Sequence, residues 1–186
     1  MATESSRIHT YQDLLAMPET NRIVELIGGE LIMTAAASYR HQKAAFKIAR
    51  RLDDFCEAYG GEMLDAPFAV YFSDTDVVEP DVIYVRPENL GRIEERRLVG
   101  PPDVAVEVSS PSMRQIDVSR KLRLYEANGV PEYWYVNLEA DRVEVHRLGD
   151  QGYGLPALYG RGDVLESPLL PGLAIAVGEI LGPAEE

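Results

Sequence analysis

Two Pro-Asp pairs constrain this chain most strongly, because each pair opens a short apolar run. Pro80-Asp81 leads into DVIYV (81–85), and Pro102-Asp103 leads into DVAVEVS (103–109). Both runs are short, apolar and bounded by turn residues, which is typical of strands. The second run carries Glu107 near its end, where a strand built for burial would not be expected to hold a charge.

The spacing of the acidic residues decides which of them can act together. Asp103 and Glu107 share one strand and lie about 13 Å apart, which is too far to share a metal ion. Asp81 and Glu107 lie on different strands, and neighbouring strands are separated by only about 4.8 Å. If these two strands pair, both carboxylates can reach one cation. Asp103 is then expected to be a strand-start or turn residue.

A carboxylate in a buried strand is protonated, paired or bound to a metal. Two carboxylates suit Mg²⁺, or Mn²⁺ in its place, because Mg²⁺ retains several waters and needs few protein ligands. Such an ion polarises a phosphodiester and generates hydroxide near neutral pH, and a nearby lysine can offset charge in the transition state. In the alternative interpretation, Asp81 only begins a strand after a turn and Glu107 is an edge charge that limits aggregation.

The remaining pattern predicts a mixed α/β fold in one domain over residues 1–186. A hairpin is expected over 21–34, turning at Gly28-Gly29, and a helix over 39–61, capped by Ser38 and stopped at Gly60-Gly61. Further elements are predicted as follows: a strand at 61–72, a polar connection at 86–100, a helix from Ser112 to about Asn128, strands at 132–137 and 142–148, and one or two strands in the tail. In the strand at 132–137, alternation places Trp134 on one face and Tyr133 and Tyr135 on the other.

Composition excludes some classes of function. The formal net charge of −13 argues against broad, nonspecific binding to nucleic acid, although a local basic strip remains possible. No apolar run reaches the roughly 18 residues of a membrane span, and the first residues do not resemble a secretion signal. The single cysteine, Cys56, excludes an internal disulfide and favours a reducing, cytoplasmic location.

Longer stretches of the sequence resemble a known family. The matching text is VELIGGEL, His41 at a helix start, VEPDVIYV, GPPDVAVEVSSPS, DVSRKLRLYEANGVPEYWYVN and VEVHRL, in order over about residues 22–148. The chain resembles the PD-(D/E)xK nuclease superfamily, and within it the large Uma-type family of inferred bacterial endonucleases. This resemblance implies a restriction-endonuclease-like fold, which is a mixed β-sheet flanked by helices, here with an N-terminal β-hairpin.

The resemblance also implies roles for individual residues. Asp81 and Glu107 become metal ligands and catalytic residues. The superfamily lysine would stand two residues after the glutamate, but Ser109 occupies that position. The family places its lysine on the following helix, which makes Lys121 the third catalytic residue. Its ammonium must then reach back to the end of the strand.

Other residues have a possible site role beside a structural one. Asp117 shares a helix face with Lys121 and could orient it, or could form a surface ion pair with it. His41 and Glu25 could line the site or serve only their local turns. Arg40, Lys43 and Lys47, followed by Arg50, recur at helical spacing and could contact phosphates, or could form an ordinary solvated face.

The first functional hypothesis is a Mg²⁺-dependent phosphodiester hydrolase acting as an endonuclease, with DNA as substrate because the resemblance implies it. The second is a non-enzymatic, nuclease-like module that binds protein or nucleic acid, motivated by the acidic charge and the displaced lysine. A third is metal-dependent hydrolysis of a small phosphorylated molecule. A homodimer is expected because many nuclease folds pair to cut two strands.

Overall fold

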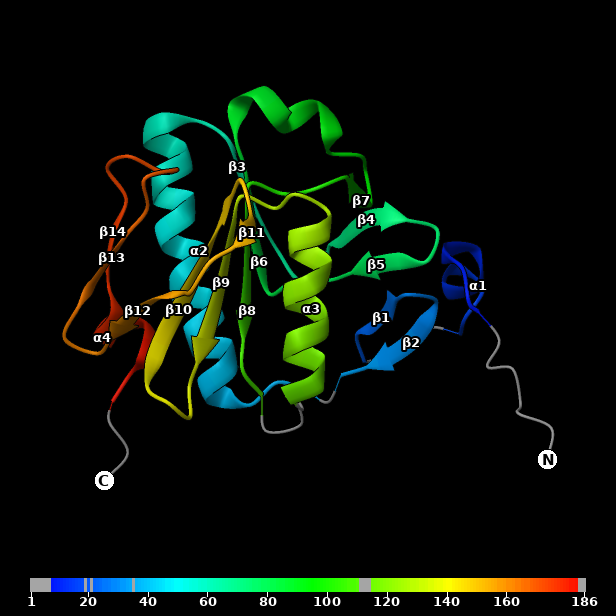
Figure 1. Cartoon of the computed structure of the whole chain (residues 1–186), viewed down its shortest axis with the longest axis horizontal. Coiled ribbons are helices and arrows are strands. Elements are labelled where there is room, and N and C mark those ends of the chain that lie inside the picture. Colours follow the sequence, from blue (N-terminus) through cyan, green and yellow to red (C-terminus); the bar gives the residue numbers. More distant parts are fainter. Residues whose placement is uncertain (1–7, 19, 21, 35, 111–114, 184–186) are drawn as a thin grey trace.

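The computed structural model describes residues 8–18, 20, 22–34, 36–110 and 115–183, with only the backbone of 115–117. Its strands form three sheets flanked by helices (Figure 1). The seven-stranded sheet contains, in spatial order, β11 (Gly152–Tyr153), β10 (Arg142–Gly149), β9 (Glu132–Asn137), β8 (Val104–Val108), β6 (Val82–Val85) and β3 (Glu62–Asp65), with β12 (Ala157–Gly160) also paired to β10. This mixed α/β architecture confirms the predicted fold class.

The other sheets are smaller. The five-stranded sheet has the order β2 (Glu30–Met33), β1 (Val24–Ile27), β5 (Asp76–Val78), β4 (Ala69–Ser73) and β7 (Arg97–Val99), and β13 (Val164–Glu166) pairs with β14 (Ala174–Ala176). The helices are α1 (Tyr11–Leu15), α2 (Tyr39–Tyr59), α3 (Gln115–Ala127) and α4 (Val177–Leu181), with a 3₁₀ helix η1 (Pro87–Arg92). No helix in the described ranges is both long and apolar enough to cross a membrane.

Helices α2 and α3 cover opposite faces of the seven-stranded sheet (Figure 1). Alternation along the strands divides the core accordingly. Val82 and Val106 pack in the cluster that contains the buried face of α2, whereas Ile83 and Ala105 pack with residues of α3. A side chain on β8 therefore faces α3 when it lies an even number of residues from Ala105, and Glu107 is such a residue.

The N-terminal hairpin forms as the sequence predicts. Gly28 and Gly29 adopt φ values of 60° and 76°, the left-handed conformation that a two-residue hairpin turn of type I′ requires. β1 and β2 pair on either side of the turn, with Ile27 opposite Glu30. β1 is buried over Val24, Glu25 and Leu26, so the hairpin carries one acidic side chain into the interior.

Both long helices end where their sequence signals indicate. The Ser38 side chain accepts a hydrogen bond from the His41 backbone at 3.2 Å and caps α2, which stops at Gly60 with a φ of 84°. α3 ends at Ala127, and Gly129 follows with a φ of 75°. The proposed cap at Ser112 lies outside the described residues.

The structure differs from the expected local structure at several places. The segment 61–72 forms two strands in different sheets, β3 and β4, because Pro67 lies between them and lacks the N–H that a continuous ladder needs. The connection at 86–100 contains η1 and β7. α1 and β5 were not predicted, and the described tail contains four strands, β11 to β14, where one or two were expected.

The aromatic strand β9 alternates as predicted. Trp134 is fully buried on the α2 face of the sheet, and Tyr133 is buried on the α3 face, with Tyr135 packed beside it. The Trp134 indole N–H donates to Glu132 at 2.8 Å, which satisfies its polar group. The three aromatic residues thus serve the core.

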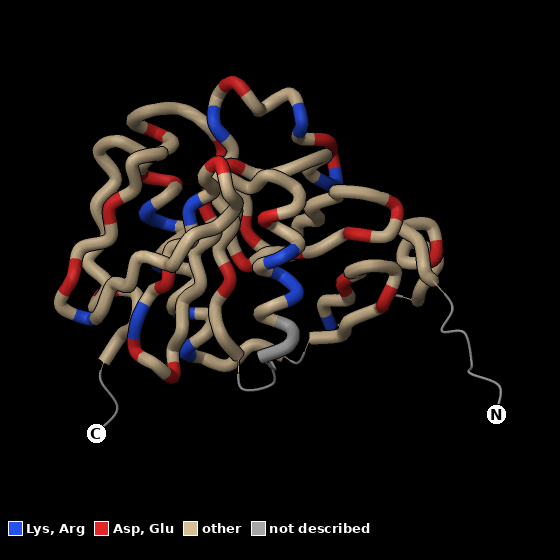
Figure 2. The backbone as a smooth tube through the Cα atoms, viewed as in Figure 1, with Lys and Arg blue, Asp and Glu red and all other residues tan. Residues whose placement is uncertain are grey.

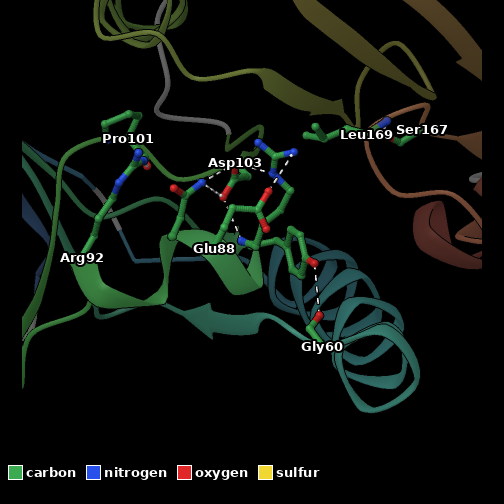
Figure 3. Close-up of polar contacts among 10 residues, drawn as sticks. Gly60, Glu88, Arg92, Pro101, Asp103, Ser167 and Leu169 are labelled. Atoms are coloured by element: carbon green, nitrogen blue, oxygen red, sulfur yellow. Dashed lines mark hydrogen bonds and ion pairs between the residues drawn. The ribbon is translucent and has the colours of Figure 1, made fainter.

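Asp103 is a structural anchor at the start of β8, as its position predicts. Asp103 is 2% exposed, and its carboxylate accepts hydrogen bonds from the Arg86 backbone and guanidinium, both at 2.8 Å (Figure 3). Asn89 donates to both carboxylate oxygens at 2.9–3.0 Å. These bonds connect the η1 segment to the start of β8, the strand that carries Glu107.

We expect the substitution Asp103→Asn to lower the free energy of unfolding by about 2–4 kcal/mol, because it removes a buried, charge-assisted acceptor. Urea denaturation monitored by circular dichroism measures the change. Asp150→Asn is the matched control, since Asp150 is exposed. Equal midpoints for the two variants would contradict the anchoring role.

Candidate functional site

Asp81 and Glu107 face each other across two paired strands. β6 and β8 are antiparallel, with Val82 opposite Val106 and Ile83 opposite Ala105. One further step in this register places Asp81 opposite Glu107. Opposed residues of an antiparallel pair point to the same face, with Cβ atoms about 5 Å apart. The strand pairing on which the shared-cation hypothesis depends is therefore confirmed, whereas metal binding itself stays a prediction.

Lys121 reaches Glu107 from α3. Its ammonium lies 2.7 Å from Glu107 Oε1, and the Tyr125 hydroxyl donates to the same oxygen at 2.6 Å. Lys121 and Tyr125 are four residues apart, so they lie one above the other on the helix face that packs on β8. Lys121 therefore reaches the end of β8 from α3, as the resemblance led us to expect. Only 6% of its side chain is exposed.

Glu25 joins the cluster from the other sheet. Its Oε1 lies 2.9 Å from the Lys121 ammonium and accepts a hydrogen bond from the Glu79 backbone, also at 2.9 Å. Its Oε2 is buried without a hydrogen-bond partner in the described part of the chain. Lys121 therefore lies between two buried carboxylates, one from β1 and one from β8.

Asp81 is held from two directions. Its Oδ2 accepts a hydrogen bond from the Val108 backbone at 2.7 Å and lies 3.2 Å from Nε2 of His41. The Ser38 cap sets His41 in the first turn of α2, close to the end of the sheet. Burial disfavours the imidazolium, but the hydrogen bond and charge of Asp81 outweigh it, so the pKa of His41 is raised.

The cluster holds more acid than base, and its pKa values reflect this. Burial raises the pKa of Glu107 to about 7; Lys121 opposes the rise, and the charges of Glu25 and Asp81 add to it. Burial disfavours the charged form of Lys121, yet Glu107 and Glu25 outweigh it and raise the pKa of this lysine. Burial raises the pKa of Tyr125 well above its usual value, so its hydroxyl remains a donor.

The arrangement of donors suits a small divalent cation with few protein ligands. Among the described residues, the hydrogen bonds to Asp81 fall on Oδ2 and those to Glu107 fall on Oε1. Asp81 Oδ1 and Glu107 Oε2 are then the oxygens left for an ion. Mg²⁺ suits such a pair, because it retains several waters and is typically held by one or two carboxylates.

The cluster opens into a cleft of about 860 Å³. Glu25, Glu79, Asp81, Glu107 and Lys121 all line it, together with His41. Apolar residues supply much of the remaining wall, from α1 and the segment after it, from the residue before β1 and from α2: Leu14, Leu15, Met17, Pro18, Ile23, Ala45 and Phe46. The buried acidic and basic groups therefore meet a substrate-sized space.

The basic residues of α2 lie mostly in intramolecular contacts. Arg40 donates to the Leu138 carbonyl at 3.4 Å, and Lys47 donates to the Glu179 carbonyl at 2.5 Å. Lys43 lies over the Tyr39 ring at 5.8 Å, and Arg50 is exposed. None of these four residues lines the cleft. Their phosphate contacts stay a prediction, and the side chain of Asp117 lies outside the described part of the structure.

Sequence reasoning did not single out several residues of the site. Tyr125 could have been found, because its spacing of four from Lys121 places both on one helix face. Glu79 enters the site two residues before Asp81, and burial raises its pKa, with the charge of Glu25 as the next cause. Arg22 and Arg96 line the cleft from loops that precede β1 and β7, which no local pattern in the sequence indicates.

The fold is that of a known nuclease-like structure. The chain superposes on the crystal structure of a "putative nuclease belonging to DUF820" from Anabaena variabilis ATCC 29413 with a TM-score of 0.78. The match covers 92% of this chain and 97% of that chain at 17% sequence identity. At this identity the likeness establishes the shared fold.

The chain belongs to the Uma2 family. The family model, described as "Putative restriction endonuclease", matches residues 11–178. This match confirms the resemblance drawn from the sequence motifs, and it extends over both main sheets and the site cluster. A search of curated proteins gave no match.

We expect Glu107 to titrate near pH 7 in the metal-free protein, well above the roughly 4.3 of an unfolded glutamate. Because its pKa is raised by folding, its contribution to stability is complete below about pH 4.3 and is lost as the pH rises through about 7. Carboxyl-carbon NMR titration measures this value, and Glu107→Gln assigns the resonance. A Glu107 signal that titrates near pH 4 would contradict the description of the cluster.

Proposed function

We propose that this protein is a Mg²⁺-dependent nuclease that hydrolyses DNA phosphodiester bonds, with Mn²⁺ able to replace Mg²⁺. The observation that carries the proposal is the convergence of Asp81 and Glu107, from paired strands, with Lys121 at the base of a cleft. Membership of a family described as restriction endonucleases supports the choice of substrate.

In this proposal, Asp81 and Glu107 would hold the ion through the carboxylate oxygens that accept no hydrogen bond from the described residues. A divalent cation at this position supplies Lewis-acid polarisation of the phosphodiester and lowers the pKa of water. The Val108 backbone and His41 fix the orientation of the Asp81 carboxylate. The Tyr125 hydroxyl fixes the orientation of the Glu107 carboxylate.

Lys121 acts as a fixed positive charge. Its raised pKa keeps it protonated near neutral pH, so it cannot serve as a general base. A preorganised ammonium in a water-poor site stabilises the negative charge that develops on the phosphoryl oxygens. Glu25 positions this ammonium through its Oε1, which lies 2.9 Å from it. Glu25 is thus a positioning residue, and Lys121 is the group that contacts substrate.

We expect Glu107→Gln and Lys121→Met each to lower the rate of plasmid or oligonucleotide cleavage in Mg²⁺ by at least about 100-fold, because each removes an interaction made with the reacting groups. Circular dichroism verifies that the variants are folded. Asp150→Asn, at an exposed position, serves as the control.

Equal cleavage by the wild type and both variants would show that the activity arises elsewhere. A wild-type protein that cleaves neither DNA nor a nucleotide analogue in Mg²⁺ or Mn²⁺ would favour the non-enzymatic module. The expected homodimer stays a separate prediction, which analytical ultracentrifugation tests.

A further inference from the structure

The reacting groups of the proposed nuclease lie deep in the cleft. The side chains of Glu107 and Lys121 are 3% and 6% exposed, and that of Asp81 is 15% exposed. A phosphodiester must descend between the cleft walls to reach them. A DNA duplex is stiff, with a persistence length of about 150 base pairs, so it cannot fold a short stretch of one backbone into such a space at low cost. An unpaired strand is more flexible, so a short stretch of its backbone can enter the cleft.

The cleft wall contains an aromatic side chain that is not part of the hydrophobic core. Phe46 of α2 lines the cleft, yet its side chain is 63% exposed, so the core does not need it. The neighbouring wall is apolar, with Leu15 also 59% exposed. An exposed ring beside an apolar surface is the platform on which single-stranded nucleic acids stack their bases, and stacking is insensitive to sequence.

Two arginines lie in position for flanking phosphates. Arg22 and Arg96 both line the cleft and are exposed. Within the described ranges, neither guanidinium has a hydrogen-bond or ion-pair partner, in contrast to Arg97, which pairs with Glu94 at 2.7 Å. Free guanidinium groups at the rim suit phosphate oxygens, which they bind in a bidentate manner.

The overall charge disfavours a duplex partner. The chain contains 31 Asp and Glu residues and 18 Lys and Arg residues, which gives a formal net charge of −13. Figure 2 shows the basic and acidic residues interspersed along the backbone. A duplex presents one negative charge per roughly 1.7 Å and is bound through many neutralised phosphates. Two arginines in the cleft can bind the phosphates of a short unpaired segment.

We propose that the cleft accepts an unpaired DNA strand, with a base stacked on Phe46 and neighbouring phosphates on Arg22 and Arg96. This inference rests on the proposed function and specifies its substrate class. Phe46 is then a specificity-determining residue that contacts substrate without taking part in the chemistry.

Cleavage kinetics test the substrate class. We expect a labelled oligonucleotide to be cleaved at least about tenfold faster as a single strand than as the matched duplex in Mg²⁺. Phe46→Ala should raise KM for the single strand about tenfold and leave kcat nearly unchanged, because stacking holds the substrate but does not act on phosphorus. Tyr59→Ala, at another exposed aromatic residue of α2 that does not line the cleft, should leave both constants unchanged.

A binding measurement separates this inference from the proposed function. Fluorescence anisotropy with a labelled oligothymidylate, in Ca²⁺ and without turnover, should show about tenfold weaker binding for Phe46→Ala and for the double variant Arg22→Gln/Arg96→Gln. Duplex cleavage at least as fast as single-strand cleavage, or equal affinity of Phe46→Ala and wild type, would overturn the inference while the nuclease stands. Phe46-dependent binding without cleavage of any DNA would refute the nuclease and retain the strand-binding cleft.

Discussion

The buried ion cluster around Lys121 is the interaction on which this structure depends. One ammonium from α3 lies between Glu107 of the seven-stranded sheet and Glu25 of the five-stranded sheet, at 2.7 Å and 2.9 Å. Burial of an unpaired carboxylate or ammonium costs several kcal/mol, so each member requires the others. The cluster therefore fixes the position of α3 against both sheets while it sets the charge of the cleft.

The cluster also explains how a nuclease-like site tolerates a lysine outside the usual strand position. Ser109 stands where the superfamily lysine would be, and its hydroxyl accepts a hydrogen bond from the Leu138 backbone at 2.9 Å. Glu107 faces α3 because alternation along β8 directs it there, so a lysine on that helix meets the same carboxylate. The Lys121 ammonium thus contacts Glu107 from α3, at 2.7 Å.

Much of the fold could be predicted from the sequence, because its signals are local. The Gly28-Gly29 turn, the Ser38 cap and the alternation in β9 each depend on a few adjacent residues. The strand expected over 61–72 was wrong: Pro67 is a local signal for its interruption, whereas the assignment of β3 and β4 to different sheets depends on distant partners. α1 and β5 are too short for periodicity to reveal them.

The residues of the candidate site also differ in how far the sequence predicts them. Asp81 and Glu107 were found from two strands whose pairing could be tested, and Lys121 was found only through family resemblance. Glu25 was considered, but its contact with Lys121 joins residues nearly a hundred positions apart, which no pattern encodes. Arg22, Arg96 and Phe46 reach the cleft from separate elements and are recognised only once the chain is folded.

We propose that Asp81 and Glu107 share one divalent cation beside Lys121. Diffraction from a crystal soaked in Mn²⁺, recorded near the manganese absorption edge, tests this proposal. We expect an anomalous peak between the Asp81 and Glu107 carboxylates that disappears in Asp81→Asn. A soaked crystal with no peak there, or with manganese bound only at other residues, would contradict it.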